Sequence, residues 1–191
     1  MNFLRRTAYW FLYRVALISW MITRPTTIGA YLAIWHDGKV LIIKNPYKNH
    51  YTLPCGGLKP GESTAEAAVR EAHEEVGILV DHTQIRLAGR FISYQEFKRD
   101  ECDVYEIELD EAPTITIDNH EVTFGKFLTS PEAKKLPMMH IVEQYLASRD
   151  STAANETPSL KSKEPPNHHL ATTGNTKPSS FETAKLTATS H

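Results

Sequence analysis

Three glutamates in one short segment have the chemistry and the spacing to hold a divalent cation. Glu71, Glu74 and Glu75 stand at positions i, i+3 and i+4, so a helix brings them to one side. Like charges on adjacent helical positions cost roughly a few tenths of a kcal/mol per pair. A hard cation such as Mg²⁺ removes this repulsion, because it prefers carboxylate oxygens and retains water and phosphate ligands. The spacing therefore favours a metal site, and the alternative is a solvated acidic face.

A helix and the loop before it must position these glutamates. Ser63, followed three residues later by Glu66, forms a capping box that predicts a helix from residue 64 to Val76, ending at Gly77. Small and apolar residues share one face of this helix, which we expect to pack on a sheet: Ala65, Ala68, Val69, Ala72 and Val76. The preceding loop, CGGLKPGE at residues 55–62, contains glycines that permit close backbone approach. Its carbonyl groups are therefore candidates to complete the coordination of a metal.

The rest of residues 26–148 reads as one globular domain of mixed strands and helices. Residues 27–35 and 39–44 are apolar runs joined by an Asp-Gly turn, which predicts a β-hairpin. Further strands are predicted at residues 51–53, 85–94, 104–109 and 122–128, a short helix at Ser130-Pro131 and a last helix at residues 138–148. Helices and strands in this order indicate an α/β (α+β) domain with helices packed on a mixed sheet.

The two ends of the chain differ from this domain. Residues 1–25 form a predicted hydrophobic, amphipathic helix with four arginines, too short and interrupted to span a bilayer. This helix either lies in a membrane interface or packs on protein, including a second copy in a homodimer. Residues 149–191 are rich in Ser, Thr, Asn and Pro, which predicts a disordered tail.

The composition limits the cellular compartments and the binding partners that we expect for this protein. Two cysteines, Cys55 and Cys102, stand far apart and in no metal-ligand spacing, which argues for a reducing compartment and against a disulfide scaffold or a zinc site. We therefore expect a cytoplasmic protein, or one that is peripheral on the inner face of a membrane. The net charge of −2 gives no basic excess, so DNA is not an expected partner.

Residues 56–78, GGLKPGESTAEAAVREAHEEVGI, resemble the Nudix box G-x5-E-x7-R-E-U-x-E-E-x-G-U, in which U is an apolar residue. Every fixed position is matched, by Gly56, Glu62, Arg70, Glu71, Glu74, Glu75 and Gly77, with Ala72 and Ile78 as the U residues. The resemblance covers about residues 26–146. It implies an α/β/α sandwich and a Nudix hydrolase, which cleaves a diphosphate linkage in a nucleoside-diphosphate derivative with Mg²⁺ or Mn²⁺.

The resemblance also implies a role for each residue of the box. The metal ligands would be Glu71, Glu74, Glu75 and the main-chain carbonyl of Cys55, where many relatives carry glycine. Arg70 and Glu62 resemble the pair that positions the catalytic glutamate. The general base would be Glu71, or an acid in a loop after the box, for which Glu121 is the candidate and His120 a weaker one.

The substrate is less well defined by the sequence. A nucleotide sugar or ADP-ribose, a nucleoside triphosphate and a dinucleoside polyphosphate all suit the box. Five aromatic residues are candidates to stack on a base or to pack in the core: Tyr47, Tyr51, Phe91, Tyr94 and Phe97. A catalytically weak nucleotide sensor, attached to a membrane or partner through the N-terminal helix, is the alternative function. An enzyme acting on the 5′ end of RNA is disfavoured by the acidic balance.

Overall fold

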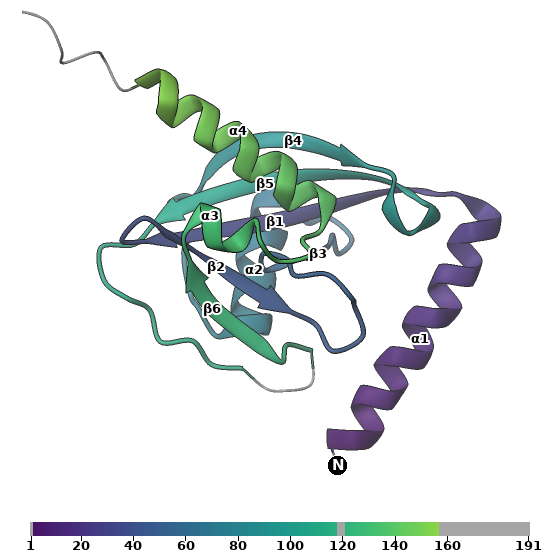
Figure 1. The fold of residues 1–191 in the computed structure, drawn as a ribbon. Coiled ribbons are helices and arrows are strands. Elements are labelled where there is room, and N and C mark those ends of the chain that lie inside the picture. Colours follow the sequence, from purple (N-terminus) through teal and green to yellow (C-terminus); the bar gives the residue numbers. More distant parts are fainter. Residues whose placement is uncertain (1, 118–120, 157–191) are drawn as a thin grey trace, which may run out of the picture. The chain divides into compact units, whose positions relative to one another are not determined.

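The computed structural model describes residues 2–117 and 121–156, and its centre is a mixed sheet of six strands. The strand order is β4-β5-β1-β2-β6, and β3 pairs with β1 (Figure 1). The strands are β1 (Thr26–His36), β2 (Lys39–Lys44), β3 (Cys55–Gly57), β4 (Arg86–Ser93), β5 (Arg99–Glu108) and β6 (Phe124–Leu128). β1 runs parallel to β5 and antiparallel to β2 and β3, so the central strand joins both halves of the sheet.

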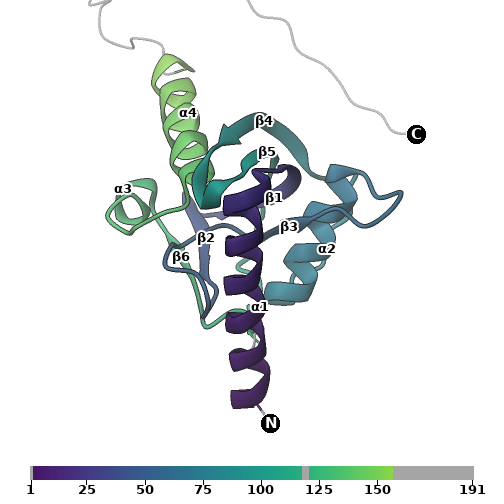
Figure 2. The same ribbon diagram turned by 90° about the vertical axis from the view of Figure 1, so that its right-hand side faces the viewer.

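Helices cover both faces of the sheet, because alternate residues of the strands are apolar on each side (Figure 2). On one face, Tyr31, Ala33 and Trp35 of β1 pack with α4 (His140–Glu156), next to the short α3 (Ser130–Ala133). On the other face, Ala30 and Leu32 pack with α2 (Thr64–Val76). The predicted α/β/α sandwich with a mixed sheet is therefore confirmed.

α2 carries the box glutamates, and both of its ends are capped as the sequence predicts. The side chain of Ser63 accepts a hydrogen bond from the Glu66 backbone N–H, and the Glu66 carboxylate accepts one from the Ser63 backbone N–H. Gly77 ends the helix at φ 72°, in the left-handed region that favours glycine. The buried positions are Ala67, Ala68, Ala72, Glu75 and Val76, whereas Ala65 and Val69 of the expected packing face are only partly buried.

α1 (Asn2–Thr23) confirms the expected N-terminal helix, and it shows two different faces. Its partly buried residues are Tyr9, Tyr13, Ala16, Leu17 and Trp20, which recur at helical spacing and form what we call the inner face. The outer face consists of exposed apolar side chains: Trp10, Phe11, Leu12, Val15, Ile18, Met21 and Ile22. Within the part of the chain that the structure describes, no helix is long and apolar enough to cross a membrane.

Several elements differ in extent from the sequence prediction. β5 begins at Arg99 instead of residue 104, because its first half pairs with β1 in a parallel ladder that starts at Thr26. Within the expected strand at residues 51–53, only Tyr51 and Thr52 form isolated bridges, and the strand that follows them is β3. α4 continues to Glu156, so residues 149–156 are helical. The rest of the expected tail, residues 157–191, lies outside the described residues.

Candidate active site

Arg70 forms several hydrogen bonds that connect the loop at residues 55–62 to α2. Its Nε and Nη2 atoms donate to the two carboxylate oxygens of Glu62 at 2.7 and 2.9 Å, a bidentate pair. Nη2 also donates to the Gly57 carbonyl at 2.9 Å, and Nη1 donates to Glu71 at 2.6 Å. The pairing with Arg70 lowers the pKa of Glu62 to about 2. One guanidinium thus fixes the loop and the Glu71 carboxylate together.

Glu71 is pressed against the backbone of Gly56. A Cβ atom on Gly56 would lie 2.0 Å from Oε1 of Glu71, so any other residue here would push the Glu71 carboxylate out of its place. Burial raises the pKa of the Glu71 carboxyl, and the negative charges of Glu74 and Glu121 add to the rise, while Arg70 opposes it. The close approach explains why the loop needs glycine here.

Glu74 is the most exposed of the three box glutamates. Its side chain is 45% exposed and accepts hydrogen bonds from Lys59 Nζ and from Nη1 of Arg70, both at 3.1 Å. Partial burial opposes ionisation, but these two cations outweigh it and lower the pKa of Glu74. The Glu74 carboxylate is therefore ionised and open to solvent at neutral pH.

Glu75 lies almost completely inside the domain, at 5% exposure. Its Oε1 accepts a hydrogen bond from Asn45 Nδ2 at 3.1 Å, and its Oε2 accepts one from the Cys55 backbone N–H at 2.9 Å. Burial raises the pKa of Glu75 to about 7, an effect that these two donors only partly offset. Burial likewise raises the pKa of the Cys55 thiol to about 12, so this side chain is a neutral packing group.

Asn45 is a site residue that the sequence does not reveal. Besides Glu75, its Nδ2 donates to the backbone carbonyl of Glu121 at 2.7 Å, while its buried Oδ1 has no hydrogen-bond partner in the described part of the chain. Asn45 follows β2 and lies far from the box in sequence. Only the tertiary fold brings it between the box helix and the downstream loop, so no local pattern predicts it.

Glu121, the downstream acid, lies close enough to the box to interact electrostatically with Glu71. Its carboxylate accepts a hydrogen bond from the hydroxyl of Tyr9 on the inner face of α1. The structure thus brings Glu121 near the box carboxylates through β6 and the loop before it. His120, the weaker candidate, lies outside the described residues.

The donor set suits a hard divalent cation. Carboxylate oxygens are the ligands that Mg²⁺ prefers. The pKa values of Glu71 and Glu75 are raised mainly by burial, with a smaller contribution from neighbouring carboxylates, and a bound cation would compensate both effects. Across residues 2–117 and 121–156, no three His, Cys, Asp or Glu side chains already converge as a ready-made ligand group. The carboxylate oxygens of Glu71 and Glu74 instead accept hydrogen bonds from Arg70. The residues present fit the metal, and their roles as ligands stay a prediction.

A cavity of about 400 Å³ opens beside the glycine loop. Gly56 and Gly57 line one side, and the amino groups of Lys48 and Lys98 come from two other segments. Burial alone would lower the pKa of Lys48, but the surrounding acidic groups outweigh it and raise it, so Lys48 carries its charge. Lys98 pairs with Asp100 at 2.9 Å. The cavity thus has two cations next to the box, and two acidic residues, Glu96 and Asp100, line it as well.

The five aromatic candidates separate into different environments. Tyr47 lies next to α1, where its ring centroid is 5.4 Å from that of Tyr13. Tyr51 packs edge-on against Phe124, and Phe91 packs edge-on against Tyr145 in the core. Tyr94 and Phe97 are 73% and 55% exposed and line a different pocket. Tyr47 is therefore the one of these five that stands at a cavity near the box.

Fold and site together define an α/β/α domain with three glutamates on α2 and a lysine-containing cavity beside the glycine loop. A model of the NUDIX domain family matches residues 23–148, which is more than half of the chain. The chain therefore belongs to the Nudix family, as the box at residues 56–78 indicated.

Known proteins resemble the chain over part of its length. An ADP-ribose pyrophosphatase from Methanocaldococcus jannaschii is 46% identical over 46 residues, which are 22% of this chain and 27% of that protein. An RNA pyrophosphohydrolase from Shewanella frigidimarina is 38% identical over 63 residues, 32% of this chain and 37% of that protein. This chain thus spans well under half the length of these relatives. A crystal structure of a C. elegans Ap4A hydrolase shares the fold, with a TM-score of 0.58 at 21% identity over 68% of this chain and 98% of that one.

Proposed function

We propose that this chain is a Mg²⁺-dependent pyrophosphohydrolase that cleaves a diphosphate linkage in a nucleoside-diphosphate derivative. The observation that carries the proposal is the position of Glu71, which is clamped between Gly56 and Arg70 beside the cavity. Mn²⁺ is a possible substitute because it accepts the same oxygen ligands.

The residues of the site have distinct tasks in this reaction. Glu71, Glu74 and Glu75 would hold a divalent cation, which when bound would supply charge neutralisation of the diphosphate and a more acidic water molecule. Lys48 and Lys98 face the cavity and add positive charge for the phosphate oxygens. Arg70 holds Glu71 in place, since it also donates to Glu62 and Gly57 in the preceding loop and to Glu74 on α2. The proton of the attacking water passes to a carboxylate, for which Glu71 and Glu121 are the two candidates.

Three substrate classes agree with the site: a nucleotide sugar or ADP-ribose, a nucleoside triphosphate, and a dinucleoside polyphosphate. The names of the relatives include an ADP-ribose pyrophosphatase and an Ap4A hydrolase, which supports the first and the third. An RNA pyrophosphohydrolase is also similar over a short stretch, yet the net charge of −2 gives little attraction for an RNA backbone. We therefore place small nucleotides before RNA.

The test is a panel of these three substrate classes and a 5′-triphosphorylated RNA, assayed with Mg²⁺ and with Mn²⁺. We expect one class to be cleaved and Glu74→Gln to lower kcat by about a hundredfold or more, the usual scale for removing one electrostatic stabiliser of a transition state. Glu143→Gln, the same change at an exposed site on α4, should leave the rate unchanged. If no compound is cleaved while nucleotides still bind, the chain is a nucleotide sensor and the enzyme proposal fails.

We also propose that the outer face of α1 contacts a membrane surface. Its exposed side chains include Phe11 and Ile18, which are 61% and 58% exposed. Besides Arg14, the sequence of α1 contains Arg5 and Arg6 and no acidic residue, so its charge is complementary to anionic lipid headgroups. A peripheral location on the inner face of a membrane follows from this contact.

Vesicle flotation tests the membrane contact on the full chain. The wild-type protein should float with phosphatidylserine-containing vesicles, and the double variant Phe11→Gln, Ile18→Gln should remain in the soluble fraction. If neither protein floats and the wild type sediments as a dimer that the double variant disrupts, the outer face is a homodimer interface instead.

A further inference from the structure

The inner face of α1 contacts the groups that surround the box cavity. Trp20 lies under Lys98, whose Nζ is 4.6 Å from the ring centroid. Trp20 and Lys98 both line the 400 Å³ cavity beside Gly56. Further along the helix, the Tyr13 hydroxyl donates a hydrogen bond to Glu96 at 2.5 Å, and Glu96 lines the same cavity. The N-terminal helix α1 therefore contributes side chains to the lining of the box cavity.

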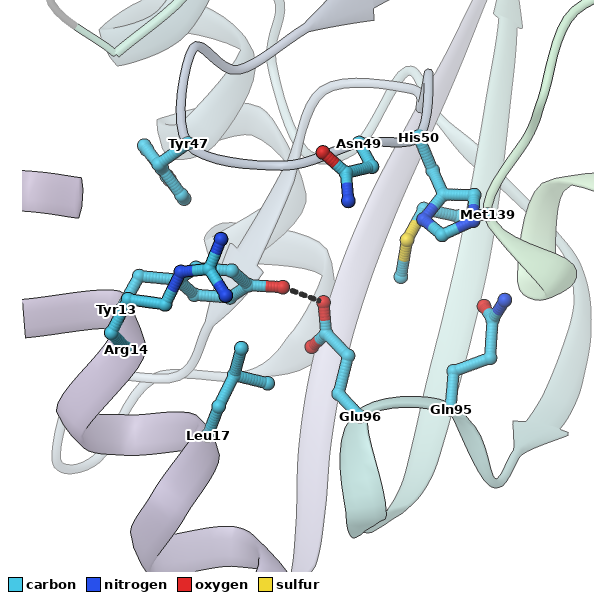
Figure 3. A pocket seen from close by; sticks show the side chains of 9 residues that line it. All are labelled: Tyr13, Arg14, Leu17, Tyr47, Asn49, His50, Gln95, Glu96 and Met139. Carbon is cyan, nitrogen blue, oxygen red and sulfur yellow. Dashed lines mark hydrogen bonds between the residues drawn. The ribbon is translucent and has the colours of Figure 1, made fainter.

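A second cavity of about 210 Å³ lies between α1, the segment after β2 and the short 3-10 helix η1 (Gln95–Phe97). Figure 3 shows the side chains that line it, with Tyr13 and Arg14 on one side and Asn49 across from them. Glu96 and Met139 line this cavity and the box cavity alike. The two cavities therefore adjoin, and a ligand can extend from the glycine loop to α1.

The second cavity has the chemistry that recognises a flat heteroaromatic ring. The rings of Tyr13 and Tyr47 meet at an interplanar angle of 53°. Arg14 lines the cavity as a planar cation that stacks on aromatic faces, and one side of its guanidinium lies over the Trp10 ring at 5.0 Å. Asn49 and Gln95 supply amide groups, which can both donate and accept hydrogen bonds at the edge of a ring. By contrast, the box cavity offers lysines, which suit phosphate. Lysines beside the glycine loop followed by aromatic and amide groups near α1 match the phosphate and the base of a nucleotide, in that order.

Backbone strain supports a functional role for η1. Glu96 and Phe97 have φ values of 58° and 63°, a left-handed conformation that is costly for residues other than glycine. This conformation places the Glu96 carboxylate against the Tyr13 hydroxyl, at the boundary of the two cavities. The strained turn thus connects α1 with the residues that line the box cavity.

We propose that the cavity between α1 and residues 47–50 binds the nucleobase of the substrate, with Tyr47 and Arg14 contacting the ring and Asn49 reading its edge. This inference rests on the proposed function, because it assumes a nucleotide whose phosphates lie beside the glycine loop. It makes α1 the element that determines which base is accepted.

Calorimetric binding of nucleoside monophosphates tests the proposal without any hydrolysis. The probes are AMP, GMP, CMP and UMP, compared with ribose 5-phosphate, which has the sugar phosphate and no base. At least one monophosphate should bind the wild-type chain more tightly than ribose 5-phosphate does. Tyr47→Leu keeps an apolar side chain but removes the aromatic face, and it should weaken that binding by about fivefold or more, the low end for base–aromatic stacking.

Two more variants separate recognition of the base from damage to the fold. Arg14→Ala, at an exposed position of α1, should also weaken the monophosphate and leave ribose 5-phosphate binding unchanged. Val15→Ala, its neighbour on the outer face, should change neither. Equal binding of all four monophosphates and ribose 5-phosphate overturns the proposal, as does unchanged binding in both Tyr47→Leu and Arg14→Ala. If the base is bound in this way but no substrate is cleaved, the proposed hydrolysis fails and the base site stands.

Discussion

Glu75 should make the metal-free protein less stable as the pH rises toward neutrality. Its pKa rises from 4.5, the usual value of a glutamate, to about 7 in the folded chain. Between these two values the native state holds a proton that the unfolded chain has released. The contribution of Glu75 to the free energy of unfolding is therefore full below pH 4.5 and lost as the pH rises through 7.

The size of this effect follows from the shift. Each pKa unit corresponds to about 1.4 kcal/mol, so a rise to about 7 gives a loss of about 3 kcal/mol across the window. Such a loss is a large part of the stability of a typical domain. It is attributable to one side chain because Glu75 is 5% exposed and solvent does not screen it.

The assay is urea unfolding in EDTA, followed by tryptophan fluorescence at several pH values from 4.5 to 8. The difference in unfolding free energy between wild type and Glu75→Gln should change by about 3 kcal/mol over this range, because the amide does not titrate. Glu74→Gln is the control, since the pKa of Glu74 is lowered rather than raised. Parallel pH curves for wild type and Glu75→Gln would refute the reasoning.

Three further substitutions probe the site. Gly56→Ala should displace Glu71, since the new Cβ would lie 2.0 Å from its Oε1. We expect turnover to be lost and urea unfolding to show a destabilisation of about 1–3 kcal/mol. Arg70→Lys keeps the charge but loses the bidentate pair, so kcat should fall by about 10–100-fold, the scale seen for groups that support metal ligands. Tyr9→Phe removes the hydroxyl that donates to Glu121, and steady-state kinetics should show kcat falling by about tenfold with KM unchanged.

Each of these substitutions has an outcome that contradicts its reasoning. An active Gly56→Ala enzyme would mean that Glu71 has room to move without loss of function. Full activity in Arg70→Lys would show that charge alone, without the fork of the guanidinium, holds the loop. If Tyr9→Phe raises KM and leaves kcat unchanged, the α1 tyrosine helps to bind substrate and has no part in positioning Glu121.

The local parts of the site follow from sequence, because short-range rules determine them. The capping box at Ser63 and the glycine at position 77 set the limits of α2, and the spacing of Glu71, Glu74 and Glu75 is a helical property. The turn between β1 and β2 is also local. Asp37 and Gly38 both have positive φ, as an Asp-Gly hairpin requires.

The parts that the sequence could not predict depend on contacts between distant segments. β5 extends back to Arg99 only because β1 lies alongside it. Glu75 is buried, whereas its neighbour Glu74 is exposed. The difference arises because Asn45 and the Cys55 backbone, both distant in sequence, pack against the Glu75 carboxylate. The inner face of α1 has an unremarkable pattern in the sequence. Its contact with Glu96 depends on a strained turn that no local signal indicates.

The joint between α1 and the central strand has a consequence for energetic coupling. Only Arg24 and Pro25 separate the helix from β1, and Arg24 has a φ of 44° while proline fixes its own φ. The short linker limits α1 to small tilts about this joint, and because α1 is one continuous helix, its inner and outer faces tilt together. A surface that binds the outer face better in one tilt of α1 must shift the affinity of the cavity on the inner face, and a nucleotide in that cavity must shift the affinity for the surface by the same factor.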